Sequence, residues 1–116
     1  TKEFYGNCFK ALTEDGILVN QHENAYYTSF AQSMRRAHCR IVNLFPICKV
    51  YQAHIPTYPS GHWLFGFASK KYDPVADLKA DAWNQLGIYT RYYNTDLHRG
   101  CFALPTYINE LLERDL

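Results

Sequence analysis

The sequence has little net charge, no long apolar run and no closely paired cysteines, and each absence excludes a class of protein. Its 116 residues carry a net charge of +1 at pH 7, so the basic surface typical of nucleic-acid-binding proteins is missing. No apolar run approaches the roughly eighteen residues of a membrane-spanning helix. The cysteines stand far apart, without a C-x-x-C pair, at Cys8, Cys39, Cys48 and Cys101. We therefore expect a cytoplasmic protein with reduced thiols that binds neither nucleic acid nor a membrane.

Hydrophobic residues are plentiful, at 47% of the sequence, and aromatic residues make up 16%. This is enough for a core, and a chain of this length forms one domain or part of one. The sequence begins at Thr1, without an initiator methionine, and enters directly into a helical pattern. We interpret residues 1–116 as a fragment, a processed product or a truncated form of a longer protein.

The first part of the chain alternates between helical and strand patterns. Apolar side chains recur at helical spacing in residues 1–12 and again in residues 28–42, which predicts two amphipathic helices. Between them, residues 17–19 form a continuous apolar run, typical of a strand covered on both faces. This order indicates an α/β fold with that strand at the centre of the sheet. Gln21 follows at the carboxyl end of the strand, where ligands bind in open α/β sheets, or else its amide satisfies loop backbone groups.

A seven-residue loop, residues 55–61, joins two apolar runs that we expect to pair as antiparallel strands, residues 48–54 and 62–68. Its two prolines fix backbone angles and remove N–H groups, so the loop should be stiff. Gly61 can adopt the left-handed angle that returns the chain. The loop should therefore present Tyr58 at its tip, beside a strand end, which is a favourable place for a ligand. The alternative is a proline-rigidified hairpin turn that binds nothing.

Three shorter helical segments are predicted after the second strand. Residues 76–85 show a helical pattern, and Pro105 suits the first turn of a last helix. Asn94 can cap a short helix that contains His98. Three tyrosines lie between these segments, and their expected role is to pack under the sheet. They are Tyr89, Tyr92 and Tyr93.

The five histidines and four cysteines match no zinc-site spacing, so we expect no metal. Histidines with hydrogen-bond partners, or surface histidines, are the expected alternative. No cysteine lies in a motif diagnostic of a covalent nucleophile.

Three ordered blocks of sequence are similar to one family. They are residues 15–21 (DGILVNQ), residues 55–61 (IPTYPSG) and residues 91–105, which contain RYYNTDLHR and FALP. In this order they resemble the C-terminal part of spermidine synthase, a polyamine aminopropyltransferase. The resemblance covers essentially all 116 residues. It implies an α/β fold, namely the late part of a Rossmann-like S-adenosylmethionine-methyltransferase-type fold, with an antiparallel strand pair around Tyr58. The nucleotide-binding half of the family is absent from residues 1–116.

The resemblance also implies a chemistry. Spermidine synthase transfers the aminopropyl group of decarboxylated S-adenosylmethionine to putrescine, giving spermidine and methylthioadenosine. The attacking amine must be neutral, and because its pKa in water is ~10, a carboxylate base must take its proton. The family's base lies in a motif that precedes the matching region. Residues 1–116 should therefore hold no catalytic residue, bind no cofactor by themselves and be inactive alone.

Three positions match putrescine-binding residues of the family. Tyr58 matches the turn tyrosine that contacts the diamine, and Gln21 matches the strand-end glutamine near the distal amine. Trp63 matches an apolar position that lines the tetramethylene pocket. Phenol and amide oxygens accept hydrogen bonds from an ammonium, and an indole covers methylenes. Trp63 is bulkier than the residue of some relatives, so the exact amine stays open, and its alternative role is a hairpin core residue.

Further partners and other functions follow from the same resemblance. An α/β sheet cut through its middle exposes an edge and an apolar face. We therefore expect contacts with the absent N-terminal half or self-association into a homo-oligomer. One other function on this fold is a methyltransferase, or an aminopropyltransferase for a different amine. Another is a non-catalytic binding or assembly module.

Overall fold

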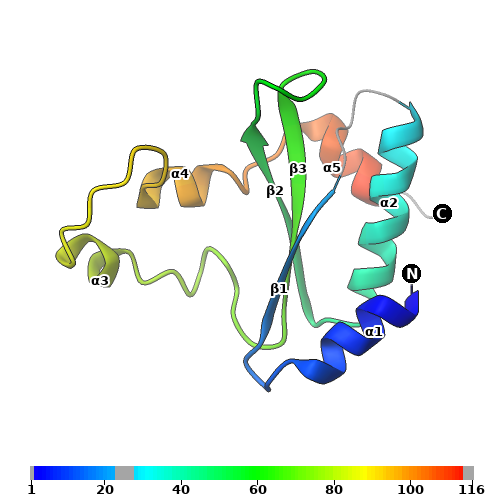
Figure 1. Cartoon of the computed structure of the whole chain (residues 1–116), viewed down its shortest axis with the longest axis horizontal. Helices are drawn as coiled ribbons and strands as arrows, with labels where there is room; N and C mark the ends of the chain where they lie inside the picture. Colours follow the sequence, from blue (N-terminus) through cyan, green and yellow to red (C-terminus); the bar gives the residue numbers. More distant parts are fainter. Residues whose placement is uncertain (1, 23–27, 114–116) are drawn as a thin grey trace.

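The centre of the molecule is a three-stranded antiparallel sheet in the order β1-β3-β2 (Figure 1). The computed structural model describes residues 2–22 and 28–113. The two strands around the loop pair antiparallel over their whole length, which confirms the expected hairpin. The strands are β1 at Ile17–Gln21, β2 at Ile47–His54 and β3 at His62–Ser69.

Helices cover one face of this sheet, and an arm extends away from the other (Figure 1). α1, α2 and α5 lie on the covered face, whereas the arm carries α3 and α4. The two early helices and the last helix are confirmed close to their expected bounds. No helix in the described ranges is long and apolar enough to cross a membrane. The helices are α1 at Lys2–Ala11, α2 at Thr28–Val42, α3 at Ala80–Gln85, α4 at Thr95–Gly100 and α5 at Thr106–Glu113.

The hydrophobic core lies between the sheet and the three covering helices. One cluster joins α2, the sheet and α5 and consists of Met34, Val50, Leu64 and Ile108. A second cluster joins the end of α2 to β3, with the apolar side of α1 packed against it. Its buried members are Ile41, Phe45 and Ala68. Both clusters follow from the predicted helical stripes, because the same side chains that recur at helical spacing face the sheet.

Alternation along β3 divides the sheet into two faces. Leu64 points towards the helices and is fully buried. Trp63, Phe65 and Phe67 point to the opposite side, which we call the open face. Residues that lie opposite one another in an antiparallel pair share a face, and Gln21 of β1 lies opposite Phe65. Gln21 therefore lies on the open face, as does Val19, which lies opposite Phe67.

The expectation that residues 17–19 form the central strand is wrong for this chain, because β3 occupies the centre and β1 an edge. Ile17 and Val19 are 43% and 52% exposed, so the apolar run is covered on one face only. Leu18 packs against the helix-facing core, as alternation requires. Among residues 2–22 and 28–113, no strand pairs with the other edge of β1. A continuous apolar run thus indicates burial on both faces only where elements exist to cover both.

The helix expected over residues 76–85 starts later, at Ala80. The Asp73 carboxylate accepts hydrogen bonds from the backbone N–H groups of Val75 and Ala76, at 2.9 and 2.8 Å, and so stabilises a turn where a helix was predicted. The short helix α4 agrees with its prediction. The Asn94 side chain caps it by accepting from the Leu97 N–H at 2.7 Å.

His98 of α4 holds the segments of the arm together. Its Nε2 lies 2.7 Å from the Pro74 carbonyl oxygen, which can only accept, so Nε2 carries the proton. Nδ1 therefore accepts from the Tyr93 hydroxyl at 2.8 Å. Tyr93 also packs edge-on against Trp83 of α3, with centroids 5.2 Å apart. One imidazole thus joins the segment after β3, the tyrosine before α4 and, through that ring, α3.

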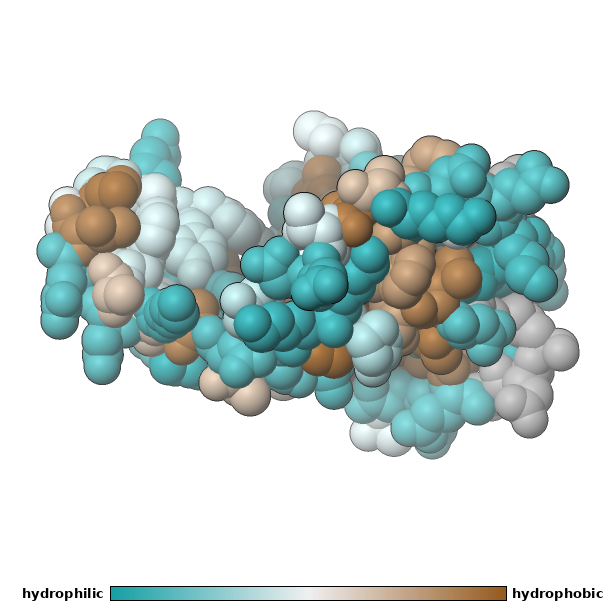
Figure 2. Space-filling view, turned by 90° about the horizontal axis from the view of Figure 1, so that it is seen from below, coloured by the Kyte–Doolittle hydropathy of each residue, from teal (hydrophilic) through white to brown (hydrophobic). Residues whose placement is uncertain are grey.

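The predicted packing of the tyrosine cluster is only partly correct. Tyr93 packs as expected, but Tyr92 and Tyr89 are 61% and 85% exposed. Figure 2 shows hydrophobic surface gathered at the end of the arm that carries α3, where Leu86 and Ile88 are exposed. The arm reaches beyond the sheet, so its tip has little of the described chain to pack against.

Candidate functional site

The loop between β2 and β3 is closed by three backbone hydrogen bonds. The Ile55 N–H donates to the Gly61 carbonyl at 2.8 Å and joins the two ends of the loop. Inside it, the Tyr58 N–H donates to the Ile55 carbonyl and the Gly61 N–H to the Tyr58 carbonyl, both at 3.0 Å. These bonds form two consecutive tight turns that meet at Tyr58, so the predicted stiff loop with this residue at its tip is present.

Two residues at the end of the loop have left-handed backbone angles. Gly61 has φ of 68°, as the sequence predicts, and this conformation costs glycine little. Ser60 has φ of 67°, which sequence reasoning missed. The Ser60 hydroxyl lies 3.4 Å from the His62 backbone N–H and can accept from it. Local hydrogen bonding of this kind explains how serine occupies a turn position that favours glycine or asparagine.

The base of the loop is joined to the segment between α4 and α5 through Gln52. Its Nε2 donates to the Ala103 carbonyl at 3.0 Å, which leaves Oε1 to accept from His62 Nε2 at 2.8 Å. Burial, followed by the neighbouring His54, lowers the pKa of His62, which favours its neutral form. The hydrogen bonds of Gln52 therefore hold the base of the loop in place, in addition to the turns within the loop.

Tyr58 rests on Trp63. The two rings meet edge to face, with centroids 4.7 Å apart and an angle of 64° between their planes. Tyr58 is 37% exposed, whereas Trp63 is only 6% exposed. The phenol thus lies at the surface above a buried indole, and the ring contact holds it there.

Trp63 is connected to the end of β1. Its indole N–H donates to the His22 carbonyl at 2.9 Å, and the His22 N–H donates to the Leu64 carbonyl at 2.9 Å. His22 directly follows Gln21, which is exposed and shares the open face with Trp63. The structure therefore brings Tyr58, Trp63 and Gln21 to the same end of the sheet, although they are far apart in the sequence.

His22 is the residue at this site that sequence reasoning missed. Its side chain is 3% exposed and lies on the helix side of the sheet, near His38 of α2, with ring centroids 6.2 Å apart. Burial and then the charge of His38 lower the pKa of His22 to about 4. The available signal was alternation, because Leu18, Asn20 and His22 are spaced by two and so share the face that packs on the helices.

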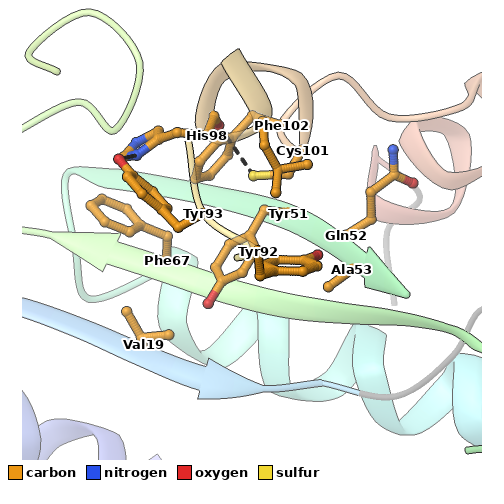
Figure 3. A pocket seen from close by; sticks show the side chains of 11 residues that line it. Val19, Tyr51, Gln52, Ala53, Phe67, Tyr92, Tyr93, His98, Cys101 and Phe102 are labelled. Carbon is orange, nitrogen blue, oxygen red and sulfur yellow. Dashed lines mark hydrogen bonds between the residues drawn. The ribbon is translucent and has the colours of Figure 1, made fainter. Parts of the chain in front are cut away.

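The open face also holds a cavity of about 290 Å³ between the sheet and α4 (Figure 3). Its wall is almost entirely apolar, and the rings of Tyr51, Phe67, Tyr92 and Phe102 contribute to it. Tyr51 stacks on Phe65 with centroids 5.2 Å apart, so an aromatic layer covers the middle of the sheet. Sequence reasoning did not find this cavity, because it forms only when α4 folds back over β2 and β3.

The described thiols and carboxylates with shifted pKa values are not tuned for catalysis at neutral pH. Burial raises the pKa of Cys48 to about 11 and also raises that of Cys101, so both remain thiols. Hydrogen bonds lower the pKa of Asp15, from the Thr13 side chain first, and of Asp73, from the Ala76 N–H first. A lowered pKa makes a carboxylate a weaker base. In the described ranges, no three His, Cys, Asp or Glu side chains gather to hold a metal ion.

The family to which these features belong is shown by comparison with known proteins. The sequence model described as "Spermine/spermidine synthase domain" matches residues 1–80, which is more than half of the chain. Polyamine aminopropyltransferase from Alkaliphilus oremlandii is 77% identical over 115 residues, which cover 99% of this chain and 40% of that protein. Polyamine aminopropyltransferase from Clostridium botulinum is 72% identical with the same coverage.

Solved structures agree with this assignment. Spermidine synthase from Thermotoga maritima superposes with a TM-score of 0.89 at 38% identity, covering 97% of this chain and 39% of that protein. A spermidine synthase in complex with the transition-state analogue AdoDATO has the same TM-score and identity. The expected fold class, part of a methyltransferase-like α/β fold, is thereby confirmed. The chain spans about 40% of the length of the curated relatives it matches. Within that span, the match over residues 1–80 and the similarity of sequence and structure show that the chain belongs to the spermine/spermidine synthase family.

Proposed function

We propose that residues 1–116 are the amine-binding, C-terminal part of the catalytic domain of a spermidine synthase. The complete enzyme would transfer the aminopropyl group of decarboxylated S-adenosylmethionine to putrescine. One observation carries the proposal, in addition to the family. The stiff loop places the Tyr58 phenol over Trp63 at the same end of the sheet where Gln21 is exposed.

The chemistry of these side chains suits a short diamine. Putrescine has an amine at each end of four methylenes, so its site needs hydrogen-bond acceptors at the ends and apolar surface between them. The Tyr58 hydroxyl and the Gln21 amide oxygen are exposed acceptors. Because Trp63 is 6% exposed, it offers the methylenes only a small part of its indole. Its larger contribution in this proposal is to hold the Tyr58 ring in place.

In this proposal the rest of the enzyme supplies the groups that carry out the chemical step. The neutral amine nitrogen forms the new C–N bond while the C–S bond of the sulfonium breaks. The sulfur keeps the bonding electrons and departs in methylthioadenosine, and the amine loses a proton to a carboxylate base. Residues 1–116 bind and orient the amine. The base and the site for the aminopropyl donor come from the N-terminal half of the enzyme, which we infer to be a partner of this chain.

The assembly and location of the enzyme are also proposals. Within residues 2–22 and 28–113, the arm tip exposes apolar side chains, and no strand pairs with the outer edge of β1. We infer that the N-terminal half and a second copy of the enzyme together bury these surfaces. The cytoplasm, where reduced cysteines persist, is the proposed compartment.

A chimera tests the proposed function directly. In this chimera the chain replaces the matching 115-residue segment of the A. oremlandii enzyme, to which it is 77% identical. The unmodified A. oremlandii protein is the reference. Purified from a host without an endogenous spermidine synthase, the chimera should form spermidine and methylthioadenosine from putrescine and decarboxylated S-adenosylmethionine, with a putrescine KM close to that of the reference.

Two outcomes would contradict the proposal. A folded chimera that binds the aminopropyl donor but does not turn over putrescine would favour a different amine or a non-catalytic module. Turnover of a longer diamine in preference to putrescine would identify a related aminopropyltransferase. Product analysis by mass spectrometry with putrescine and its longer homologues, each supplied separately, distinguishes these cases.

A further inference from the structure

The His22 ring occupies a slot that only a glycine on β3 leaves free. A Cβ atom added to Gly66 would collide with the Asn20 and His22 side chains. On its other side the His22 ring is near His38 of α2. The imidazole is thus enclosed between a strand and a helix, which limits how far the end of β1 can shift.

The hydrogen bond from Asn20 also determines the tautomer of the His22 ring. The Asn20 amide nitrogen lies 3.1 Å from His22 Nδ1, and because that nitrogen donates, Nδ1 accepts and the proton resides on Nε2. Nε2 is buried and has no hydrogen-bond partner within the described part of the chain. Burial lowers the pKa of this group, so the neutral ring persists at physiological pH. A neutral imidazole keeps Nδ1 free to accept from Asn20.

The backbone of His22 connects the two faces of the sheet. Its N–H bonds to Leu64 and its carbonyl accepts the indole N–H of Trp63, each at 2.9 Å. Gln21, the preceding residue, ends β1 on the open face. The ring therefore lies on the helix side, whereas the groups that its backbone places lie on the side proposed to bind the amine.

We propose that His22 is a positioning residue for the diamine acceptor, which it places through Gln21 and the Trp63 indole without contacting it. This inference rests on the proposed function. If the ring is lost, the strand end and the indole gain freedom, and Tyr58 loses the firm support beneath it. The effect should fall on the acceptor alone, because the donor site is assigned to the other half of the enzyme.

The experiment is a double-mutant cycle in the chimera with His22→Ala and Trp63→Phe. His22→Ala should raise the KM for putrescine roughly ten- to a hundredfold, the scale of loss that small misplacements cause. The KM for decarboxylated S-adenosylmethionine should not change. Trp63→Phe removes the indole N–H and leaves only the route through Gln21, so His22→Ala should raise the putrescine KM by a smaller factor in that background. Such non-additivity is the signature of two residues that act through one another.

Further variants complete the design. His22→Gln keeps a flat group that can accept from Asn20, and it should recover most of the putrescine KM. If His22→Ala does not fold, the same cycle is measured with His22→Leu, which fills the slot but cannot accept from Asn20, and its effect should again be non-additive with that of Trp63→Phe. Tyr89→Phe is the control, because Tyr89 is 85% exposed on the arm, and its kinetics should equal those of the chimera.

Failure of this inference can be distinguished from failure of the proposed function. If the unmodified chimera does not use putrescine, the proposed function is wrong and the role of His22 falls with it. If the chimera is active but His22→Ala leaves the putrescine KM unchanged, or raises both KM values together, His22 is only a core residue. Additive effects of the His22 and Trp63 substitutions would likewise overturn the positioning role.

Discussion

The Tyr58 ring packs against Trp63, and Trp63 is itself held in place because its indole N–H donates to the His22 carbonyl at 2.9 Å. The ring contact joins centroids 4.7 Å apart. An aromatic pair of this kind contributes about 0.5–1.5 kcal/mol beyond the area it buries. The Tyr58 ring is therefore held without help from its hydroxyl, so packing and hydrogen bonding can be separated by experiment.

Tyr58→Phe in the chimera should lower kcat/KM for putrescine by roughly ten- to a hundredfold. The substitution keeps the ring on Trp63 but removes a hydrogen bond to a charged amine, which contributes about 1.5–3 kcal/mol. The KM for the aminopropyl donor and the melting temperature should stay the same. Steady-state kinetics with each substrate varied in turn provide the measurement.

Tyr89→Phe is the matched control for this experiment, because Tyr89 is 85% exposed on the arm. It removes the same hydroxyl and should leave all kinetic constants unchanged. Putrescine kinetics in Tyr58→Phe that equal those of the chimera would make Tyr58 a turn residue with no role in binding. A collapse of stability would instead assign the hydroxyl to the fold.

Gly66→Ala should reduce the free energy of unfolding, whereas Gly100→Ala should not. At Gly66 a Cβ atom would collide with Asn20 and His22, and overpacking of this kind costs about 1–3 kcal/mol. At Gly100, the last residue of α4, nothing in the described structure lies within 4 Å of the added atom. Alanine there gains helix propensity of up to about 1 kcal/mol.

Urea unfolding of both glycine variants of the chimera measures this difference. Equal stability of the two variants would show that the slot between β1, β3 and α2 is looser than the structure indicates. The same result would argue against His22 as a positioning residue, because its ring would not be held rigidly.

Stability should fall as the pH falls from about 6.5 towards 4. Burial, and then His38, lowers the pKa of His22 from 6.5 to about 4. Between these values the unfolded chain binds a proton at His22 that the folded chain does not, so acid favours unfolding. The contribution is complete above pH 6.5 and is lost as the pH approaches 4. At about 1.4 kcal/mol per pH unit it is on the order of 3 kcal/mol.

Urea unfolding of the chimera at several pH values measures this slope. His22→Gln should flatten it, because the variant carries no titrating group at position 22. A slope unaffected by His22→Gln would mean that other groups account for the acid sensitivity. His38 would then be the first to test, since burial also lowers its pKa.

His98→Ala should loosen the arm without changing the sheet. The substitution removes the hydrogen bonds to the Pro74 carbonyl and the Tyr93 hydroxyl. Backbone amides of α3 and α4 should then exchange with deuterium faster, because local opening becomes less costly. Hydrogen exchange read by mass spectrometry measures this, and the amides of β3 serve as an internal reference.

Arg99→Ala is the neighbouring control, since Arg99 forms an exposed ion pair with Asp96 at 3.8 Å. Such pairs contribute about 0–1 kcal/mol, so exchange should remain as in the chimera. Unchanged exchange in His98→Ala would show that the contact between Tyr93 and Trp83 is enough to hold the arm.

Local patterns in the sequence predict the elements of this fold well. α2 has the predicted bounds, and the Asn94 cap and the left-handed Gly61 are where they were expected. Each of these features depends on residues within a few positions of one another. Propensity, capping and turn chemistry act over that range, so the sequence contains the necessary information.

Features that depend on distant partners could not be predicted in this way. The place of β1 in the sheet depends on which strands pair with it, and its apolar run reads the same at an edge as at the centre. The burial of His22 depends on Gly66, a residue of β3 that has to lack a side chain. The proximity of Gln21 to Trp63 arises from the pairing of β1 with β3, so only the resemblance to a family indicated that they belong together.

The edge position of β1 has a practical consequence for protein engineering. One side of this strand is paired with β3, and the other has no strand along it in residues 2–22 and 28–113. Unpaired backbone groups at such an edge are a template for another strand. The chimera can therefore be divided before α1 into two separately produced polypeptides. Strand addition at β1 would drive their reassembly, and recovered aminopropyl transfer would report on it.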